Sequence, residues 1–105
     1  MELGKHIRKD FPIFARNAAV PFVYLDSAAT SLKPARVLDA MWEYYEAYSA
    51  NVSRGVYPMA ERATNAYEES RAVIGHFIGA NRPEEIVFVR NATEAINLLA
   101  TSFGD

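Results

Sequence analysis

The chain has 105 residues, half of them hydrophobic, a net charge near −2 and no cysteine. This length suits one domain, and the lack of cysteine excludes disulfides, thiolate metal sites and a cysteine nucleophile within these residues. The charge gives no basic surface for nucleic acid or an anionic membrane, and no apolar run reaches the roughly 20 residues of a membrane span. With two distant histidines and no signal peptide indicated, we expect a cytoplasmic protein without a metal site.

The first thirty residues predict one short helix and one short strand. Residues 2–10 have an amphipathic pattern that we expect to be a helix, and Pro12 should end it because the residue before a proline avoids the α region. Residues 22–25 predict a strand. The small residues at 26–31 would then let a ligand approach the backbone closely.

A longer helix is expected from Pro34, a residue favoured at the first helical position, to about Tyr48. Apolar residues at helical spacing predict its buried face: Val37, Leu38, Met41, Trp42, Tyr45 and Tyr48. The polar loop at 50–58 follows, and there Gly55 is expected to supply a backbone turn that a larger residue would resist.

The longest helix is expected from about Met59 to Ile78, with Gly79 as its C-cap. Its apolar residues again share one face, which predicts burial: Ala60, Ala63, Tyr67, Ile74, Phe77 and Ile78.

Residues 85–100 are the most informative stretch, because they predict a strand that turns into a helix. The apolar run 86–89 is typical of a strand covered on both faces, as in parallel sheets. Asn91 is a good N-cap, and Glu94 has capping-box spacing, from which it can accept the Asn91 N–H. The first-turn N–H groups and Thr93 can hold a phosphate instead, so a capping box and an anion site both remain open.

Two isolated strands are marginal, because each needs neighbouring strands and covering helices. The pattern therefore predicts the opening portion of a larger α/β protein. An independent α-rich domain of 105 residues with a two-stranded ribbon is the alternative.

Six motifs in one order resemble a known family. They lie at 24–30, 33–34, 51–55, 62–64, 77–80 and 87–98. Together they resemble the N-terminal quarter of cysteine desulfurases and selenocysteine lyases, which are class V aminotransferases dependent on pyridoxal phosphate. The resemblance implies the fold type I, three-layer α/β/α architecture, here mostly helical with two short strands. It also implies that 1–105 is one segment, with 1–30 as an arm and small-domain strand and 34–105 as the start of the large domain.

The resemblance implies a cofactor site at the last motif. Thr93, with the N–H groups around it such as that of Ala92, matches the threonine that contacts the cofactor phosphate. Asn97 matches an asparagine near the cofactor pocket, although a plain helix-surface amide is the alternative. Glu94 would cap the helix or face the substrate.

The resemblance also implies a substrate side. Ala28 and Ala29 match a small pair beside the substrate, with a tight turn as the alternative. Arg54 matches an arginine of a loop near the active site and the dimer contact, with a surface salt bridge as the alternative. The family usually has histidines where this chain has Ser53 and Tyr57, a difference that concerns the substrate side rather than the cofactor.

The resemblance implies a parent enzyme that converts cysteine to alanine and passes the sulfur to an enzyme cysteine for iron–sulfur assembly. It implies a homodimer with a possible sulfur-acceptor protein. No lysine here, Lys33 included, has the context of the Schiff-base lysine, so we expect this segment alone to be inactive and not to bind the cofactor. The alternatives are another class V enzyme (an aminotransferase, an epimerase or a kynureninase) and a small non-enzymatic helical module that binds partners through Trp42 and Tyr45.

Overall fold

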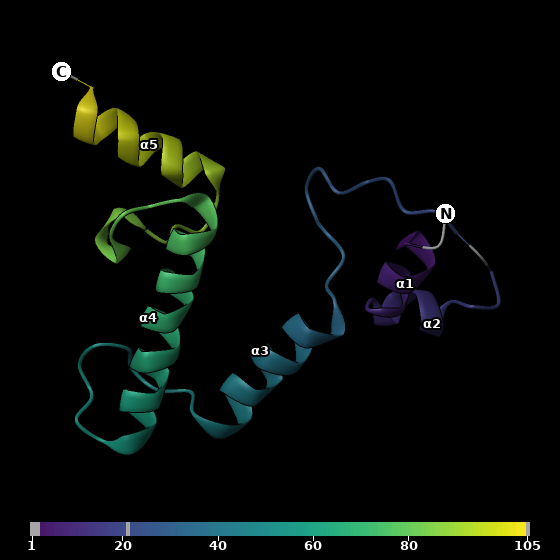
Figure 1. Cartoon of the computed structure of the whole chain (residues 1–105), viewed down its shortest axis with the longest axis horizontal. Coiled ribbons are helices and arrows are strands. Elements are labelled where there is room, and N and C mark those ends of the chain that lie inside the picture. The colour runs from purple at the N-terminus through teal and green to yellow at the C-terminus, as the bar shows by residue number, and fades with distance from the viewer. Residues whose placement is uncertain (1–2, 21, 105) are drawn as a thin grey trace. The chain divides into compact units, whose positions relative to one another are not determined.

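The computed structural model describes residues 3–20 and 22–104 (Figure 1). Its elements are α1 (Leu3–Lys9), α2 (Pro12–Arg16), α3 (Ala35–Ala47), α4 (Pro58–Ile78), the 3-10 helix η1 (Pro83–Glu85) and α5 (Ala92–Phe103). The chain divides into two compact units, residues 1–63 and 64–105, and α4 contributes to both. Each unit is described by itself.

In the first unit, α1 and α2 pack against each other. The helix expected at 2–10 is confirmed as α1, but α2 was not predicted. Pro12 ends one helix and also opens the next, because its fixed φ and missing N–H suit a first-turn position. The Arg8 guanidinium lies 3.8 Å from the centre of the Phe14 ring and donates a 2.8 Å hydrogen bond to the Phe22 carbonyl.

The strand expected at 22–25 is wrong. The segment that links α2 to α3 forms no strand in its described part. A strand requires a neighbouring strand to complete its hydrogen-bond ladder, whereas this segment is held by side chains. Besides the Arg8 bond, the Tyr24 hydroxyl donates to the Thr30 carbonyl at 2.7 Å.

Helix α3 has nearly the predicted length, with Pro34 as its N-cap rather than its first helical residue. Its predicted buried face is wrong: no residue of α3 is buried, and Trp42 and Tyr45 are 71% and 69% exposed. The helical spacing correctly identified an apolar stripe. A stripe is buried only when another element covers it, and the pattern does not reveal whether the chain supplies that element.

The loop before α4 makes its turn differently from the prediction. The residue with positive φ is Ser53 (φ 70°), and Gly55 is not among the described residues with positive φ. Gly55 is required for space instead, since a Cβ there would lie 2.1 Å from the Cβ of the buried Ala60. Nearby, Arg62 pairs with Glu43 and lies 4.1 Å from the centre of the Tyr48 ring.

Helix α4 confirms its predicted bounds to within a residue. Gly79 has φ 78°, as expected of a C-cap, and the Ala80 N–H donates a hydrogen bond of 2.9 Å to the Gly75 carbonyl. The predicted buried face is right at Ala60 and Ala63. It is wrong toward the C-terminal end, where the side chains are exposed: Tyr67, Ile74, Phe77 and Ile78.

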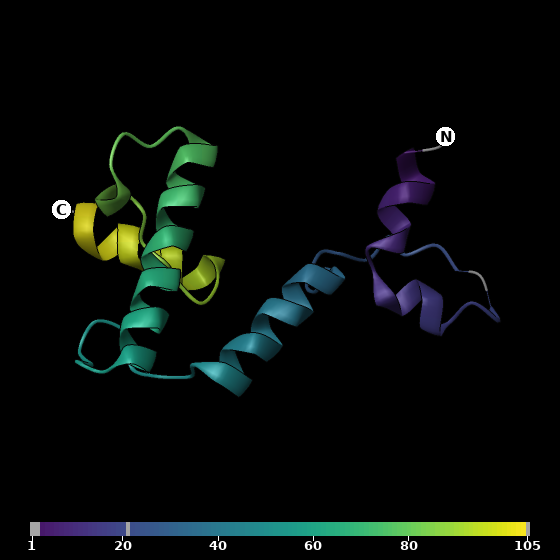
Figure 2. The same ribbon diagram turned by 60° about the horizontal axis from the view of Figure 1, so that its bottom comes forward.

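The second predicted strand, at 86–89, is also absent from the described residues. Ile86 has the extended backbone of a strand (φ −100°, ψ 117°) and is only 7% exposed, but no neighbouring strand pairs with it. Figures 1 and 2 show the segment after η1 passing α4 before it enters α5. The prediction therefore identified one extended and buried residue, Ile86, but not a sheet, and residues 87–89 are exposed.

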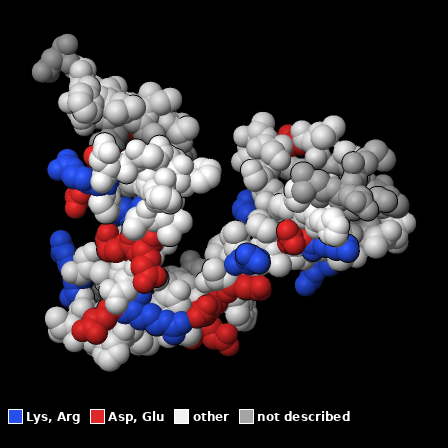
Figure 3. Space-filling model, viewed as in Figure 1, with Lys and Arg blue, Asp and Glu red and all other residues white. Residues whose placement is uncertain are grey.

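Little of the apolar surface is buried. The accessible surface is 9363 Å², whereas a compact monomer of 11.7 kDa would expose about 5,900 Å², and two separate compact halves about 7,100 Å². Figure 3 shows wide uncharged areas between the acidic and basic side chains. Many large apolar side chains of the described residues are therefore exposed.

Candidate functional site

The start of α5 is shaped first by its cap. Asn91 has extended backbone (φ −165°, ψ 172°), and its side-chain oxygen accepts the Glu94 N–H at 2.9 Å. The Asn91 carbonyl accepts the Ala95 N–H at 3.2 Å, which closes the first helical turn. The predicted N-cap is confirmed, and it uses the third N–H of the helix.

Glu94 does not close the predicted capping box. Its carboxylate accepts the backbone N–H of Arg90 at 2.6 Å, one residue before the N–H that the box predicted. It also accepts the Arg90 guanidinium through Nε and Nη2, each at 3.2 Å. These bonds lower the pKa of Glu94, chiefly through the Arg90 side chain and then through its backbone. The Glu94 charge is thus partly neutralised and bound to Arg90.

Three backbone N–H groups therefore remain at this helix end, and two of them, those of Ala92 and Thr93, belong to the first helical turn itself. Among the hydrogen bonds of the described residues, none uses the N–H of Ala92 or Thr93, nor the Thr93 hydroxyl. Both residues are exposed. The helix dipole is positive here, so this turn presents two N–H groups, one hydroxyl and a favourable field to an anion.

Asn97 lies one turn after Thr93, on the same side of α5. It is exposed, and its backbone carbonyl accepts the Thr101 hydroxyl at 3.0 Å. Ala92, Thr93, Glu94 and Asn97 are thus brought together by one helix. Arg90 was not among the predicted site residues, although its i, i+4 spacing from Glu94 is a signal for such a pair.

The expected substrate residues lie in loops of the first unit. Ala28 and Ala29 are exposed in the segment between α2 and α3. Arg54 is exposed in the loop before α4 and takes part in none of the ion pairs that the described residues form. Among those residues, no hydrogen bond joins Arg54 to Ala28 or Ala29.

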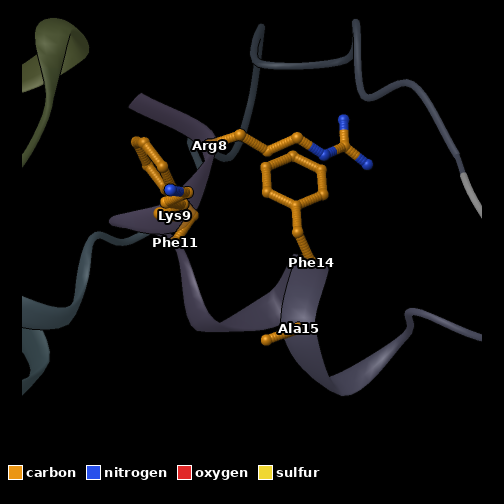
Figure 4. A pocket seen from close by; sticks show the side chains of 5 residues that line it. All are labelled: Arg8, Lys9, Phe11, Phe14 and Ala15. Carbon is orange, nitrogen blue, oxygen red and sulfur yellow. The ribbon is translucent and has the colours of Figure 1, made fainter. Parts of the chain in front are cut away.

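A separate pocket of about 240 Å³ lies in the first unit, around Arg8 and Phe14 (Figure 4). Lys9, Phe11 and Ala15 complete its lining, which is mostly apolar. It contains none of the predicted site residues. Within the described part of the chain there is also no cluster of metal-ligating side chains and no helix long and apolar enough to cross a membrane.

Comparison with known proteins decides the family. The model of the family described as "Aminotransferase class-V" matches residues 23–105. The chain belongs to the class-V aminotransferase family.

This class-V chain is similar to proteins described as cysteine desulfurases or probable cysteine desulfurases. Probable cysteine desulfurases of Streptomyces coelicolor and Synechocystis are each 52% identical to it, over 93% and 97% of this chain. The apo structure of a cysteine desulfurase from Thermococcus onnurineus NA1 is 46% identical over 95% of this chain, with a TM-score of 0.82. In each case this chain covers 24% of the relative. It thus shares the fold of part of a cysteine desulfurase and spans about a quarter of that length.

Proposed function

We propose that this chain forms the N-terminal part of a pyridoxal-phosphate-dependent cysteine desulfurase and supplies one wall of the cofactor pocket. Class-V membership and the relatives described as cysteine desulfurases support the enzyme class. This evidence favours an enzyme over a small interaction module. The parent architecture is the three-layer α/β/α fold of type I, with residues 1–30 as an arm and small-domain segment and 34–105 as the start of the large domain.

The observation that carries the proposal is the set of free donors at the start of α5. A phosphate dianion needs several hydrogen-bond donors and positive potential, and the Ala92 and Thr93 N–H groups, the Thr93 hydroxyl and the helix dipole provide them. Glu94 would oppose a dianion if its carboxylate were free. Because Arg90 binds that carboxylate, the residues present fit the cofactor phosphate.

On the substrate side, each expected residue has a role that its position allows. Ala28 and Ala29 have no bulk that would exclude a substrate beside the cofactor. Arg54 has no ion-pair partner among the described residues and can bind an anionic group of substrate or partner subunit. We propose that Asn97 borders the cofactor pocket and that Glu94 faces the substrate side.

The remaining chemistry belongs to other parts of the enzyme. When bound, pyridoxal phosphate supplies the electron sink for bond changes at the amino acid's α-carbon. Lys33 is engaged locally, because its Nζ donates to the Ser31 carbonyl before α3. The chain contains no cysteine to accept sulfur. We therefore propose that these residues bind and orient, and that they neither catalyse nor retain the cofactor alone.

The wider setting follows from the enzyme class. A second copy would form a homodimer with the active site near the subunit boundary. The sulfur would pass to an enzyme cysteine, then to an acceptor protein for iron–sulfur assembly, in the cytoplasm.

A chimera tests the function. This chain replaces the matching quarter of the Thermococcus onnurineus desulfurase. Alanine and sulfide formed from cysteine are measured with an added dithiol, which reduces the enzyme persulfide and releases its outer sulfur as sulfide. We expect the chimera to release both in equal amounts, whereas the 105-residue chain with added pyridoxal phosphate releases neither. A folded chimera that binds the cofactor but forms no alanine would contradict a desulfurase. A borohydride-stable adduct at Lys33 of the 105-residue chain would contradict the proposal that this chain does not retain the cofactor alone.

A further inference from the structure

The segment that leads into α5 is held without a sheet. Ile86 is buried against Gly75 of α4, where a Cβ would lie 3.5 Å from Ile86 Cγ1. Phe88 packs edge-on against Tyr67, with ring centres 5.0 Å apart. Within the described residues, the one pair of elements in extensive contact is α1 and α2, so α5 packs at most weakly on another helix. The position of its first turn therefore depends on how residues 86–88 are attached to α4.

Arg71 of α4 contacts both parts of this segment, the Ile86 carbonyl and the Phe88 ring. Its guanidinium donates to the Ile86 carbonyl and, through Nε, to Glu68 at 3.0 Å. The same group lies 5.2 Å from the centre of the Tyr67 ring and 5.3 Å from that of Phe88. The side chain is only 20% exposed, which makes it far more enclosed than the other arginines that form ion pairs here.

This arrangement uses properties specific to arginine. A planar guanidinium can donate along its edge to a carbonyl and a carboxylate while its charge attracts neighbouring aromatic rings. An apolar side chain of similar length would fill the space but leave the Ile86 carbonyl without this donor. A lysine would keep the charge and one donor but not the planar fork.

We propose that Arg71 is a positioning residue that fixes residues 86–88 on α4 and so sets the place of the anion-binding turn at Ala92 and Thr93. Only three residues link Phe88 to that turn, and each spans at most about 3.6 Å. If Phe88 detaches from α4, the N–H groups of Ala92 and Thr93 are therefore no longer held in place. The consequence for phosphate rests on the proposed function, whereas the attachment itself does not.

The test uses the 105-residue chain labelled for NMR spectroscopy. Contacts between the Tyr67 and Phe88 rings are read from nuclear Overhauser effects, and inorganic phosphate is titrated against the amide signals of Ala92 and Thr93. Arg71→Met keeps the apolar stem, and Arg71→Lys keeps the charge. Arg82→Met is the matched control, because Arg82 also pairs with a glutamate, Glu85, but is 74% exposed and lies over no aromatic ring among the described residues.

We expect Arg71→Met to lose the ring contacts and weaken phosphate binding at least fivefold. Arg71→Lys should restore part of both, and Arg82→Met should change neither. Unchanged ring contacts and affinity in Arg71→Met would overturn the proposal. If Arg71→Met loses its helical circular dichroism, the unmodified chain is measured instead. The absence of nuclear Overhauser effects between Arg71 and the Phe88 ring in that chain would overturn the proposal. A wild-type chain that keeps the ring contacts but ignores phosphate contradicts the proposed anion site and leaves the attachment supported.

Discussion

Two side chains, Asn91 and Glu94, decide which donors at the start of α5 stay free. Asn91 takes the Glu94 N–H, and Arg90 holds the Glu94 carboxylate. Asn91→Ala should destabilise helical α5 by about 1 kcal/mol, because the cap is lost. Amide hydrogen exchange at Ala95 should then be about fivefold faster. Asn81→Ala is the control, since the Asn81 side chain makes none of the hydrogen bonds of the described residues, and an equal effect there would contradict the capping role.

The pairing of Glu94 with Arg90 gives α5 a defined pH dependence. Because the pKa of Glu94 is lowered from its ordinary value of 4.5, ionised Glu94 stabilises the folded helix above that pH. The contribution is lost as the pH falls through the lowered pKa. A carboxyl-detected NMR titration should find Glu94 below 4.5, and Arg90→Met should move it back toward 4.5. The backbone N–H of Arg90 remains in this variant, so the return should be partial, and no movement would contradict the pairing.

The helices were largely predictable, and the strands were not, for a common physical reason. Helical hydrogen bonds close within the segment, so spacing and Pro34 located α3 to within a residue at each end, and the Asn91 cap located the start of α5. A strand needs a partner that local sequence does not contain, so 86–89 forms only an extended segment here. The same dependence explains why the predicted burial of α3 is wrong, because no other described element covers its apolar stripe.

At the candidate site, sequence located the turn but not its hydrogen bonds. The Asn91 cap followed from residue type and spacing. The choice of Arg90 rather than Asn91 as the donor to Glu94 did not, because two adjacent N–H groups are both within reach of a flexible carboxylate. Ala28, Ala29 and Arg54 came from family resemblance, and their roles remain proposals.

The close approach of Gly55 to Ala60, in the loop before α4, can be tested by substitution. Gly55→Ala should cost about 1–3 kcal/mol, because the new methyl group would overlap Ala60 and force the loop away. Faster amide exchange at Ala60, whose N–H donates to the Tyr57 carbonyl at 2.9 Å, would report this. Gly4→Ala is the matched change, since nothing lies within 4 Å of its Cβ position. Equal behaviour of the two variants would contradict a close approach at Gly55.

Across the whole chain, exposed apolar surface outweighs the core. Among the residues whose burial is described, the buried hydrophobic ones are Ala60, Ala63 and Ile86, whereas Trp42 is 71% exposed. The isolated chain should therefore self-associate with rising concentration, and in dilute solution acrylamide should quench Trp42 nearly as well as in urea. Analytical ultracentrifugation and fluorescence measure both. A shielded Trp42 in a monomer that melts cooperatively would instead indicate a self-contained domain.

The affinity of the chimera for pyridoxal phosphate bears most directly on the role of α5. Thr93→Ala should weaken cofactor binding at least tenfold, because it removes the hydroxyl that the free turn offers to the phosphate. Thr101→Ala in the same helix should leave it unchanged, because the Thr101 hydroxyl is engaged with the Asn97 and Leu98 carbonyls. Equal affinities for Thr93→Ala and the unmodified chimera would show that this turn does not hold the phosphate.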